Sequence, residues 1–381
     1  MSSTTTSAPF SKAVVSAMRR LYPESLADKS FDNTGLLLES PYDPIRRQMN
    51  SVLLTVDLTK AVADEAIERN DSIVIAYHPI IFRGLKSLTL SNSQQQSLLR
   101  LAAEGISVYS PHTAIDAAPG GLGDWLADIV TGTPAEPPSS EDNDDETPAS
   151  SRPASPTKPT PSEKEDPFTL KRPVFQLQHH PSQLSLQESA LQLGNTSHKR
   201  VPIVPSKVAG YEDTGAGMGR IVRFDKPQAL TDIIDRIGLG LGNPKGFPIA
   251  VPQGKTMSEI QIRSVAICAG SGGHMFSGLD DVDLLFTGEL SHHEALAAIE
   301  SGKCVICLFH SNTERGFLHS VLKPQLEKAV KEEWDRVRKG EKARSDLSEE
   351  YAEALEDDHV EIQVSEVDRD PYGIMISKQE L

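Results

Sequence analysis

The sequence predicts an α/β fold made of two lobes, each with a mixed, largely parallel sheet. Two observations support this prediction. Short runs rich in Val, Ile and Leu alternate with stretches of helical periodicity, and the same rhythm recurs on both sides of a long polar segment. Strands that alternate with helices are typical of parallel pairing. We therefore expect a first lobe at residues 1–133, an insertion at residues 134–199 and a second lobe at residues 200–381.

The first lobe is predicted to begin with a helix over residues 10–21, whose apolar residues Val14, Val15, Met18 and Leu21 recur at helical spacing. Short apolar runs bounded by polar residues then predict buried strands, at residues 52–57, 73–77 and 106–109. Stretches of helical periodicity separate these runs, at residues 61–69 and 94–103. The first of these helices is expected to end near Asn70 and the second near Gly105.

The insertion is predicted to be disordered. Residues 134–167 contain nine prolines, nine acidic and three basic residues, with no aromatic residue, Val, Ile, Leu or Met. Such a segment cannot bury enough apolar surface to offset the entropy lost on ordering. The Gln-rich stretch up to residue 199 is sparsely apolar, and we expect it to extend the insertion with a few anchoring contacts. His179 and His180 in this stretch have no third ligand nearby in the sequence and are expected to be solvated.

The second lobe repeats the alternation of the first. Strands are expected at residues 265–268, 284–286 and 305–309, and helices at residues 292–299 and 317–330. The run at residues 327–358 carries charges of both signs and few apolar residues, so it is expected to form an exposed helix and loop. A last apolar run at residues 360–364 is predicted to add a strand to one of the sheets.

Composition excludes several classes of protein. The net charge of −16 repels phosphate backbones, so general nucleic-acid binding is not expected. No run approaches the roughly 18 apolar residues that a membrane span needs, so no membrane partner is expected. Three cysteines are too few for a disulfide framework and favour a reducing compartment. We expect a cytoplasmic protein, with mitochondria and nucleus left open. The Ser/Thr-rich, acid-free leader before the first helix resembles a transit peptide, but it is expected to be only a short tail.

Polar side chains follow the predicted strands where each strand ends, which is where open α/β sheets bind ligands. They are Asp57, His78, His112 with Asp116, the Gly-rich turn at 270–273, Glu289, and His310 with Glu314. His112 and Asp116 are four residues apart, as are His310 and Glu314, so each pair would share one side of a helical turn. Mixed histidine and carboxylate ligands favour zinc, manganese, iron or nickel over calcium.

Several of these residues have an ordinary structural alternative. Glu289 is a candidate general base or an orienting group, and equally a carboxylate stabilised at a helix N-terminus. Arg315 could neutralise an anionic substrate or pair with an acid on its own helix. The glycines at 270–273 could cradle a phosphate or simply allow tight packing. His292 and His293 lie in the first turn of a predicted helix, where a ligand role is the less favoured reading.

Several segments resemble signature segments of one family, in the same order along the chain. They are YHPIIF at 77–82, SPHTAIDAA at 110–118, CAGSG at 268–272, TGELSHH at 287–293 and HSNTERG at 310–316. Two flanking segments are also similar, DNTGL at 32–36 and SEVDRDP at 365–371. Over about residues 10–133 and 200–376 the chain resembles the Ngg-interacting-factor-three family, also called GTP cyclohydrolase I type 2-like.

This resemblance implies two divalent metal ions between the lobes and a toroidal homo-oligomer, commonly a hexamer. It implies that His78 and Asp116 hold one ion, that His310 holds the other and that Glu314 is shared, with His112 as a further candidate ligand. One position departs from the bacterial pattern of two adjacent histidines, because Tyr77 precedes His78 here as it does in eukaryotic members.

Two functions follow from the resemblance. The first is a metal-dependent hydrolase acting on a small nucleotide-like or phosphorylated compound. The second is a scaffold or transcription-associated interaction protein with protein partners, in which the metals are structural. An open metal position would distinguish the enzyme, because structural metal sites are usually closed.

Overall fold

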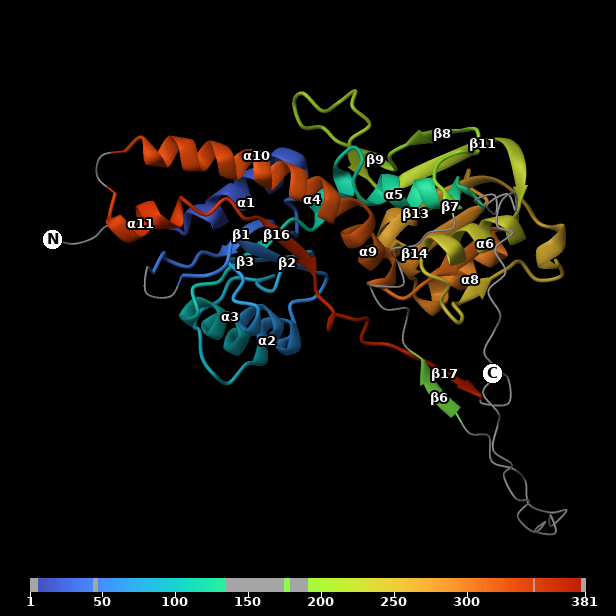
Figure 1. The fold of residues 1–381 in the computed structure, drawn as a ribbon. Coiled ribbons are helices and arrows are strands. Elements are labelled where there is room, and N and C mark those ends of the chain that lie inside the picture. The colour runs from blue at the N-terminus through green and yellow to red at the C-terminus, as the bar shows by residue number, and fades with distance from the viewer. Residues whose placement is uncertain (1–5, 44–46, 135–174, 179–190, 345–346, 378–381) are drawn as a thin grey trace, which may run out of the picture.

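The computed structural model describes residues 6–43, 47–134, 175–178, 191–344 and 347–377 (Figure 1). Within these residues the chain forms two large mixed sheets with helices on both faces of each, which confirms the predicted α/β class. One apolar core runs through both lobes, and a smaller cluster lies on the outer face of each sheet.

The first sheet has the strand order β1-β4-β3-β2-β16. Four of its strands are parallel, namely β2 (Ser51–Thr55), β3 (Ile73–Ala76), β4 (Ser107–Ser110) and β16 (Glu361–Val364), whereas β1 (Gly35–Leu38) runs antiparallel to β4. Because side chains alternate along a strand, Leu53 packs toward α2 (Lys60–Glu68) and α3 (Ser93–Ala103). Val52 and Leu54 belong to the core on the other face, with α1 (Pro9–Leu21).

The second sheet has the strand order β12-β15-β14-β13-β11-β8. Its centre is parallel, formed by β13 (Gln261–Ser271), β14 (Leu284–Glu289) and β15 (Cys304–Cys307), and its outer strands β12 (Ile249–Ala250), β11 (Arg220–Ala229) and β8 (His198–Val201) are antiparallel. One face packs against α5 (Leu122–Val130), α6 (Leu230–Gly240) and α9 (Asn312–Phe317). The other face carries α7 (Gly273–Phe276) and α8 (His292–Glu300).

The two lobes exchange elements along the chain. Helix α5 lies within residues 1–133 yet packs against the strands of the second sheet. Strand β16 comes near the end of the chain yet pairs in parallel with β2 of the first sheet. Arg220, on β11, is 1% exposed and donates two hydrogen bonds to Asp124 on α5. A single cut in the sequence therefore does not separate one sheet with its helices from the other.

Two short segments of the predicted insertion pair with strands elsewhere in the chain, in the stretch where a few anchoring contacts were expected. Strand β6 (Phe175–Gln178) pairs antiparallel with β17 (Ile374–Ser377), and this ribbon projects from the body of the molecule in Figure 1. Strand β7 (Leu191–Gln192) pairs with β5 (Thr133–Pro134), and the Leu191 side chain is buried. Pairing with strands far away in the sequence orders these segments despite their weak local pattern. His179 and His180 lie outside the described residues.

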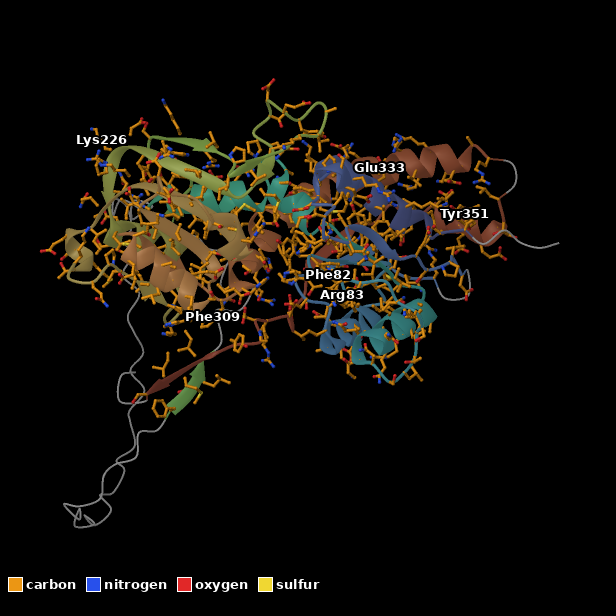
Figure 2. All side chains as sticks on the ribbon, turned by 180° about the vertical axis from the view of Figure 1, so that it is seen from behind. Phe82, Arg83, Lys226, Phe309, Glu333 and Tyr351 are labelled. Atoms are coloured by element: carbon orange, nitrogen blue, oxygen red, sulfur yellow. The ribbon has the colours of Figure 1, made fainter. Side chains whose placement is uncertain are left out.

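The charged run near the C-terminus is also more buried than predicted. Helix α10 (Lys323–Lys342) follows α9 through the π-helical turn Leu318–Leu322 and packs along α1. Its apolar residues recur at three- and four-residue intervals, and Trp334 is 1% exposed with its ring 5.5 Å from that of Phe10. Figure 2 marks Glu333 on the same helix. A few apolar residues at helical spacing thus suffice to bury one face of a strongly charged helix.

None of the described helices combines the length and the apolar character that crossing a bilayer requires.

Candidate metal centre

Three histidines meet where the carboxyl ends of the two sheets face each other. His78 follows β3 and His112 follows β4 of the first sheet, whereas His310 follows β15 of the second. The ring of His78 lies 5.6 Å from that of His112 and 5.3 Å from that of His310. The structure therefore brings together side chains that are up to 232 positions apart in the sequence.

Each histidine ring is held by a carboxylate at its Nδ1 atom. The Nδ1 distances are 2.8 Å from His78 to Asp57, 2.7 Å from His112 to Asp32 and 2.9 Å from His310 to Glu289. When Nδ1 donates its proton to a carboxylate, the ring is fixed in orientation and Nε2 remains as the ligand atom. This carboxylate–histidine arrangement is the usual one around protein-bound metal ions.

The His78–Asp57 pair stabilises its own charged form, as the pKa shifts of both groups show. Burial by itself would lower the pKa of His78, but the neighbouring Glu314 and Asp57 carboxylates raise it to about 10. Burial also opposes ionisation of Asp57, yet its hydrogen bond to His78 and the charges of His78, Arg315 and His310 together outweigh this and lower the pKa of the Asp57 carboxyl. The cluster thus holds strong negative charge that attracts a cation, whether a proton or a metal ion.

Glu314 lies between two of the histidines and is 3% exposed. Its Oε2 atom is 3.4 Å from His78 Nε2, and its Oε1 atom is 3.7 Å from His310 Nε2. Among the described residues, Oε2 makes no hydrogen bond of good geometry, and His78 Nε2 at 3.4 Å is an ion-pair partner only. A buried carboxylate oxygen without a donor is costly, and a metal ion would satisfy it. The ligand atoms of His78, His310 and Glu314 all lie within 4.8 Å of one another, so these residues could hold a metal ion.

Gly270, at the end of β13, borders the same space. Its φ of +61° is in the left-handed region, and a Cβ atom there would lie 2.8 Å from His310 Nε2 and 3.0 Å from Glu314 Oε1. A Cβ atom on Gly272 would likewise lie 2.6 Å from Thr287 Oγ1. Of the two readings of this Gly-rich turn, close packing against the candidate ligands is the one these contacts support.

Asp116 and Tyr77 lie beside the three-residue cluster. The Asp116 carboxylate accepts a hydrogen bond of 2.8 Å from the Tyr77 hydroxyl. Burial raises the pKa of Tyr77 well above its ordinary value, so the phenol remains a donor at neutral pH. Burial, partly offset by the charge of His112 and the bond from Tyr77, raises the pKa of Asp116 to about 6. Tyr77 thus contacts a predicted metal ligand directly.

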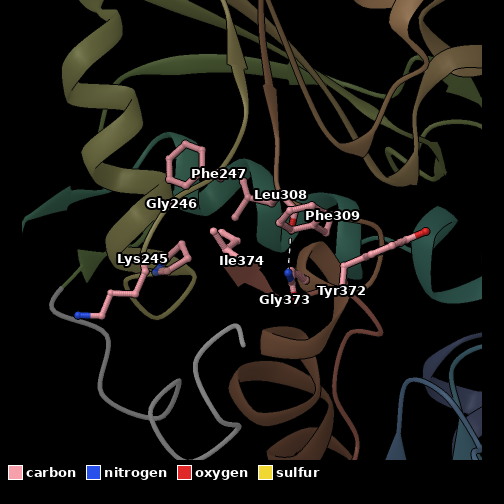
Figure 3. Close-up of a pocket in the computed structure, with 10 residues that line it drawn as sticks. Lys245, Gly246, Phe247, Leu308, Phe309, Tyr372, Gly373 and Ile374 are labelled. Atoms are coloured by element: carbon pink, nitrogen blue, oxygen red, sulfur yellow. Dashed lines mark hydrogen bonds between the residues drawn. The ribbon is translucent and has the colours of Figure 1, made fainter. Parts of the chain in front are cut away.

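Two residues at the centre have strained backbones. His112 itself has a φ of 30°, and Phe309, immediately before His310, has a φ of 66°. Such values are rare for residues with a Cβ atom and gather at functional sites. The Phe309 ring packs against the C-terminal segment, with its centroid 6.3 Å from that of Tyr372. Both residues line a cavity of about 10 Å³ (Figure 3). That cavity is no larger than a single water.

Arg315 is buried, so the predicted contact with a substrate is not available to it in this structure. The side chain is 4% exposed, with Nη2 3.1 Å from Asp57 and Nη1 2.5 Å from Asp368. Both acidic partners come from distant segments, whereas its own helix contributes only Ser311, whose hydroxyl accepts a hydrogen bond from Arg315 Nε. Through Asp57, the Arg315 guanidinium braces the carboxylate that orients His78.

Of the remaining candidate residues, Glu289 contacts the histidine cluster, whereas His292 and His293 contact each other. Glu289 is half exposed, and its Oε1 atom lies 2.9 Å from His310 Nδ1. His292 and His293 are exposed in the first turn of α8, which Ser291 caps, and they contact each other.

The residue that sequence reasoning missed is Asp32. Its side chain is completely buried against His112, 80 positions away, and only the similarity of residues 32–36 to a family segment hinted at it.

A cavity of about 680 Å³ opens beside the cluster. His78 and Asp57 form part of its wall, together with Lys60 at the start of α2 and the exposed Arg369. The volume lies within the usual range for small-molecule sites. Of the candidate ligands, His78 therefore borders a space large enough for a metabolite.

Comparisons with known proteins agree with this architecture. The sequence pattern of the Duf34/NIF3 (NGG1p interacting factor 3) family matches residues 11–338. The chain is 38% identical over 316 residues to the protein NIF3 homolog of Schizosaccharomyces pombe, covering 83% of this chain and 88% of that protein. It is 36% identical over 320 residues to NGG1-interacting factor 3 of Saccharomyces cerevisiae, covering 82% and 89%.

Solved structures show the same fold. A Bacillus cereus protein related to NIF3 aligns with a TM-score of 0.55 at 18% identity, covering 97% of this chain and 99% of that one. Reduced HcgD from Methanocaldococcus jannaschii aligns with a TM-score of 0.52 at 17% identity, covering 94% and 98%. The resemblance found in the sequence is confirmed, and the chain belongs to the Duf34/NIF3 family.

Proposed function

We propose that this protein binds two divalent metal ions and is a metal-dependent hydrolase acting on a small nucleotide-like or phosphorylated compound. The observation that carries the proposal is Glu314, a buried carboxylate without a hydrogen-bond donor on Oε2, placed between the Nε2 atoms of His78 and His310. A divalent cation between these atoms would bind Oε2 more closely than the 3.4 Å ion pair with His78 Nε2 does.

In this proposal His78, His310 and Glu314 hold one ion, and Asp116 and His112 contribute to a second. Imidazole nitrogens with carboxylate oxygens suit zinc, manganese, iron or nickel. Divalent ions here would supply Lewis acidity and lower the pKa of a water. Asp57, Asp32 and Glu289 orient the histidines, and the contact of Glu289 with His310 supports that role over a general base.

The cavity beside His78 supports an enzyme over a closed structural site. Structural metal sites use all their positions for protein ligands, whereas catalytic sites keep one open. Lys60 and Arg369 line the cavity with positive charge, although Lys60 also pairs with Asp64. The carboxylates on the same wall are already engaged, Asp57 by His78 and Arg315 and Asp370 by Ser311. A substrate with an anionic group matches this charge, which is why phosphorylated compounds are the proposed class.

Metal content per chain, measured by elemental mass spectrometry, tests the proposal. We expect near two ions in the wild type and a sharp loss in a His310→Ala/Glu314→Ala double variant. Content near one would indicate that Tyr77 weakens the second position. A panel of nucleotides and phosphoesters then tests catalysis, and metal-dependent turnover that Glu314→Ala abolishes would support the enzyme. Absence of stoichiometric metal after reconstitution would refute it.

The second candidate function is a metal-stabilised scaffold with protein partners. The Saccharomyces cerevisiae relative is named as an interacting factor, which supports this reading. A toroidal homo-oligomer, commonly a hexamer, is proposed with either function and is testable by mass photometry. The three described cysteines are free, which agrees with the proposed cytoplasmic location. Bound metal without turnover on any compound of the panel would favour the scaffold.

A further inference from the structure

Two phenylalanines are exposed beside the candidate metal centre. Phe31 is 52% exposed and Phe82 is 45% exposed, and their ring centroids are 6.3 Å apart. Each ring lies 6.4 Å from the His112 ring and meets it nearly edge-on, at 87° and 79°. The two aromatic rings thus border the same histidine from two separate loops.

The loops that carry these rings are tied to the centre. Asn33, two positions after Phe31, donates a hydrogen bond to the carbonyl of Ile81, next to Phe82. Asp32, adjacent to Phe31, is bonded to His112. Figure 2 places Phe82 near the junction between the lobes. The rings are therefore held in place by the groups that orient the candidate ligand.

Neither ring contributes to the apolar cores found in the described residues. Exposed apolar groups scattered singly over a surface need no explanation, but a fixed pair beside a polar site indicates contact with a ligand. Small-molecule sites commonly combine such apolar walls with a few charged groups.

We propose that Phe31 and Phe82 contact a flat aromatic ring of the substrate, as the base of a nucleotide provides. This inference rests on the proposed function. His112 contacts both phenylalanines, its ring is 5.6 Å from that of His78, and His78 in turn lines the cavity that contains Arg369. The base would then lie on one side of the metal centre and the anionic group on the other.

Stacking on aromatic side chains is worth about 5- to 150-fold in affinity per base and tolerates any base. The test compares adenosine 5′-monophosphate with ribose 5-phosphate, which lacks the ring, by calorimetric titration of the metal-loaded full chain. We expect the wild type to bind the nucleotide at least tenfold more tightly. In a Phe31→Leu/Phe82→Leu variant this preference should fall below threefold, while the affinity for ribose 5-phosphate stays the same.

Phe175→Leu is the matched control, because Phe175 is 51% exposed but lies on the projecting ribbon formed by β6 and β17. It should keep the wild-type preference. Equal binding of the two compounds by the metal-loaded wild type, or binding of neither, would refute the inference and leave the metal site standing. A change in particle mass in the double variant would instead assign the rings to an interface between copies. Wild type without bound metal would refute the proposed function itself.

Discussion

Substituting Gly270 with Ala tests whether a metal ion occupies the space between His310 and Glu314. The new methyl group would lie 2.8 Å from His310 Nε2 and 3.0 Å from Glu314 Oε1, both closer than ordinary contacts allow. The His310 and Glu314 side chains must then move by some tenths of an ångström. A displacement of that size takes the ligand atoms away from the positions that bind the ion. We expect the ion held by His78, His310 and Glu314 to be lost, so that metal content falls by about one ion per chain.

The matched control is Gly302→Ala. Gly302 has a φ of +82°, close to the +61° of Gly270, but a Cβ atom there meets nothing within 4 Å. Both variants should lose roughly 1–2 kcal/mol of stability without metal, since Ala is strained in the left-handed region. That loss is small beside a typical unfolding free energy of about 5–15 kcal/mol, so both variants should fold.

Denaturant unfolding with and without metal is the assay. A ligand at 100 times its dissociation constant stabilises a protein by about 2.7 kcal/mol. Wild type and Gly302→Ala should gain this amount, whereas Gly270→Ala should gain less than about 1 kcal/mol because its affinity is reduced. If Gly270→Ala binds and gains as much as the control, the ion does not lie between His310 and Glu314, and the site is wrongly placed.

Four further outcomes follow from the structure. Glu314→Gln should abolish binding of the ion between His78 and His310, whereas Glu289→Gln should weaken its affinity only about 10- to 100-fold, because Glu289 acts through the ligand His310. Equal losses in metal titrations would contradict this order. Asp124→Asn should cost about 3–5 kcal/mol in denaturant unfolding, because Arg220 is 1% exposed and loses its charged partner. Burial raises the pKa of Asp124, but the hydrogen bond and charge of Arg220 lower it below its ordinary value. Its contribution is therefore complete above the unfolded pKa of about 3.9 and lost as pH falls through the lower folded pKa. The stability difference between wild type and Asp124→Asn should shrink below about pH 4, and a constant difference would count against this assignment. Trp334→Ala should cost about 3–5 kcal/mol, because the ring is 1% exposed against α1; a loss under 1 kcal/mol would show that α10 is loosely packed.

Much of the candidate site could be predicted because it follows strands. His78, His112 and His310 each come directly after a run of apolar residues that forms a parallel strand. Parallel strands place their carboxyl ends on one edge, so chemically active residues at those ends gather without any further information. The spacing of four residues between His310 and Glu314 likewise predicted that both face the same space, and their closest atoms are 3.7 Å apart.

The partners of these residues could not be predicted in the same way. Asp32 carries no local signal of its role, because its contact with His112 depends on where a loop 80 positions away is placed. Arg315 shows the same limitation, since its partners Asp57 and Asp368 lie on segments that meet only in the folded chain. The local sequence around an arginine on a helix does not distinguish an exposed side chain from a buried one.

The sequence by itself determined the α/β class, the principal strands and helices, the family and the residues that cluster at the strand ends. Periodicity and strand boundaries are local properties, and a single chain displays them directly. Only the tertiary structure decided that β16 joins the first sheet, that α5 packs on the second, and that each histidine has its own carboxylate. Those outcomes depend on backbone pairing and burial between segments distant in the sequence, where side-chain type alone leaves many partners equally possible.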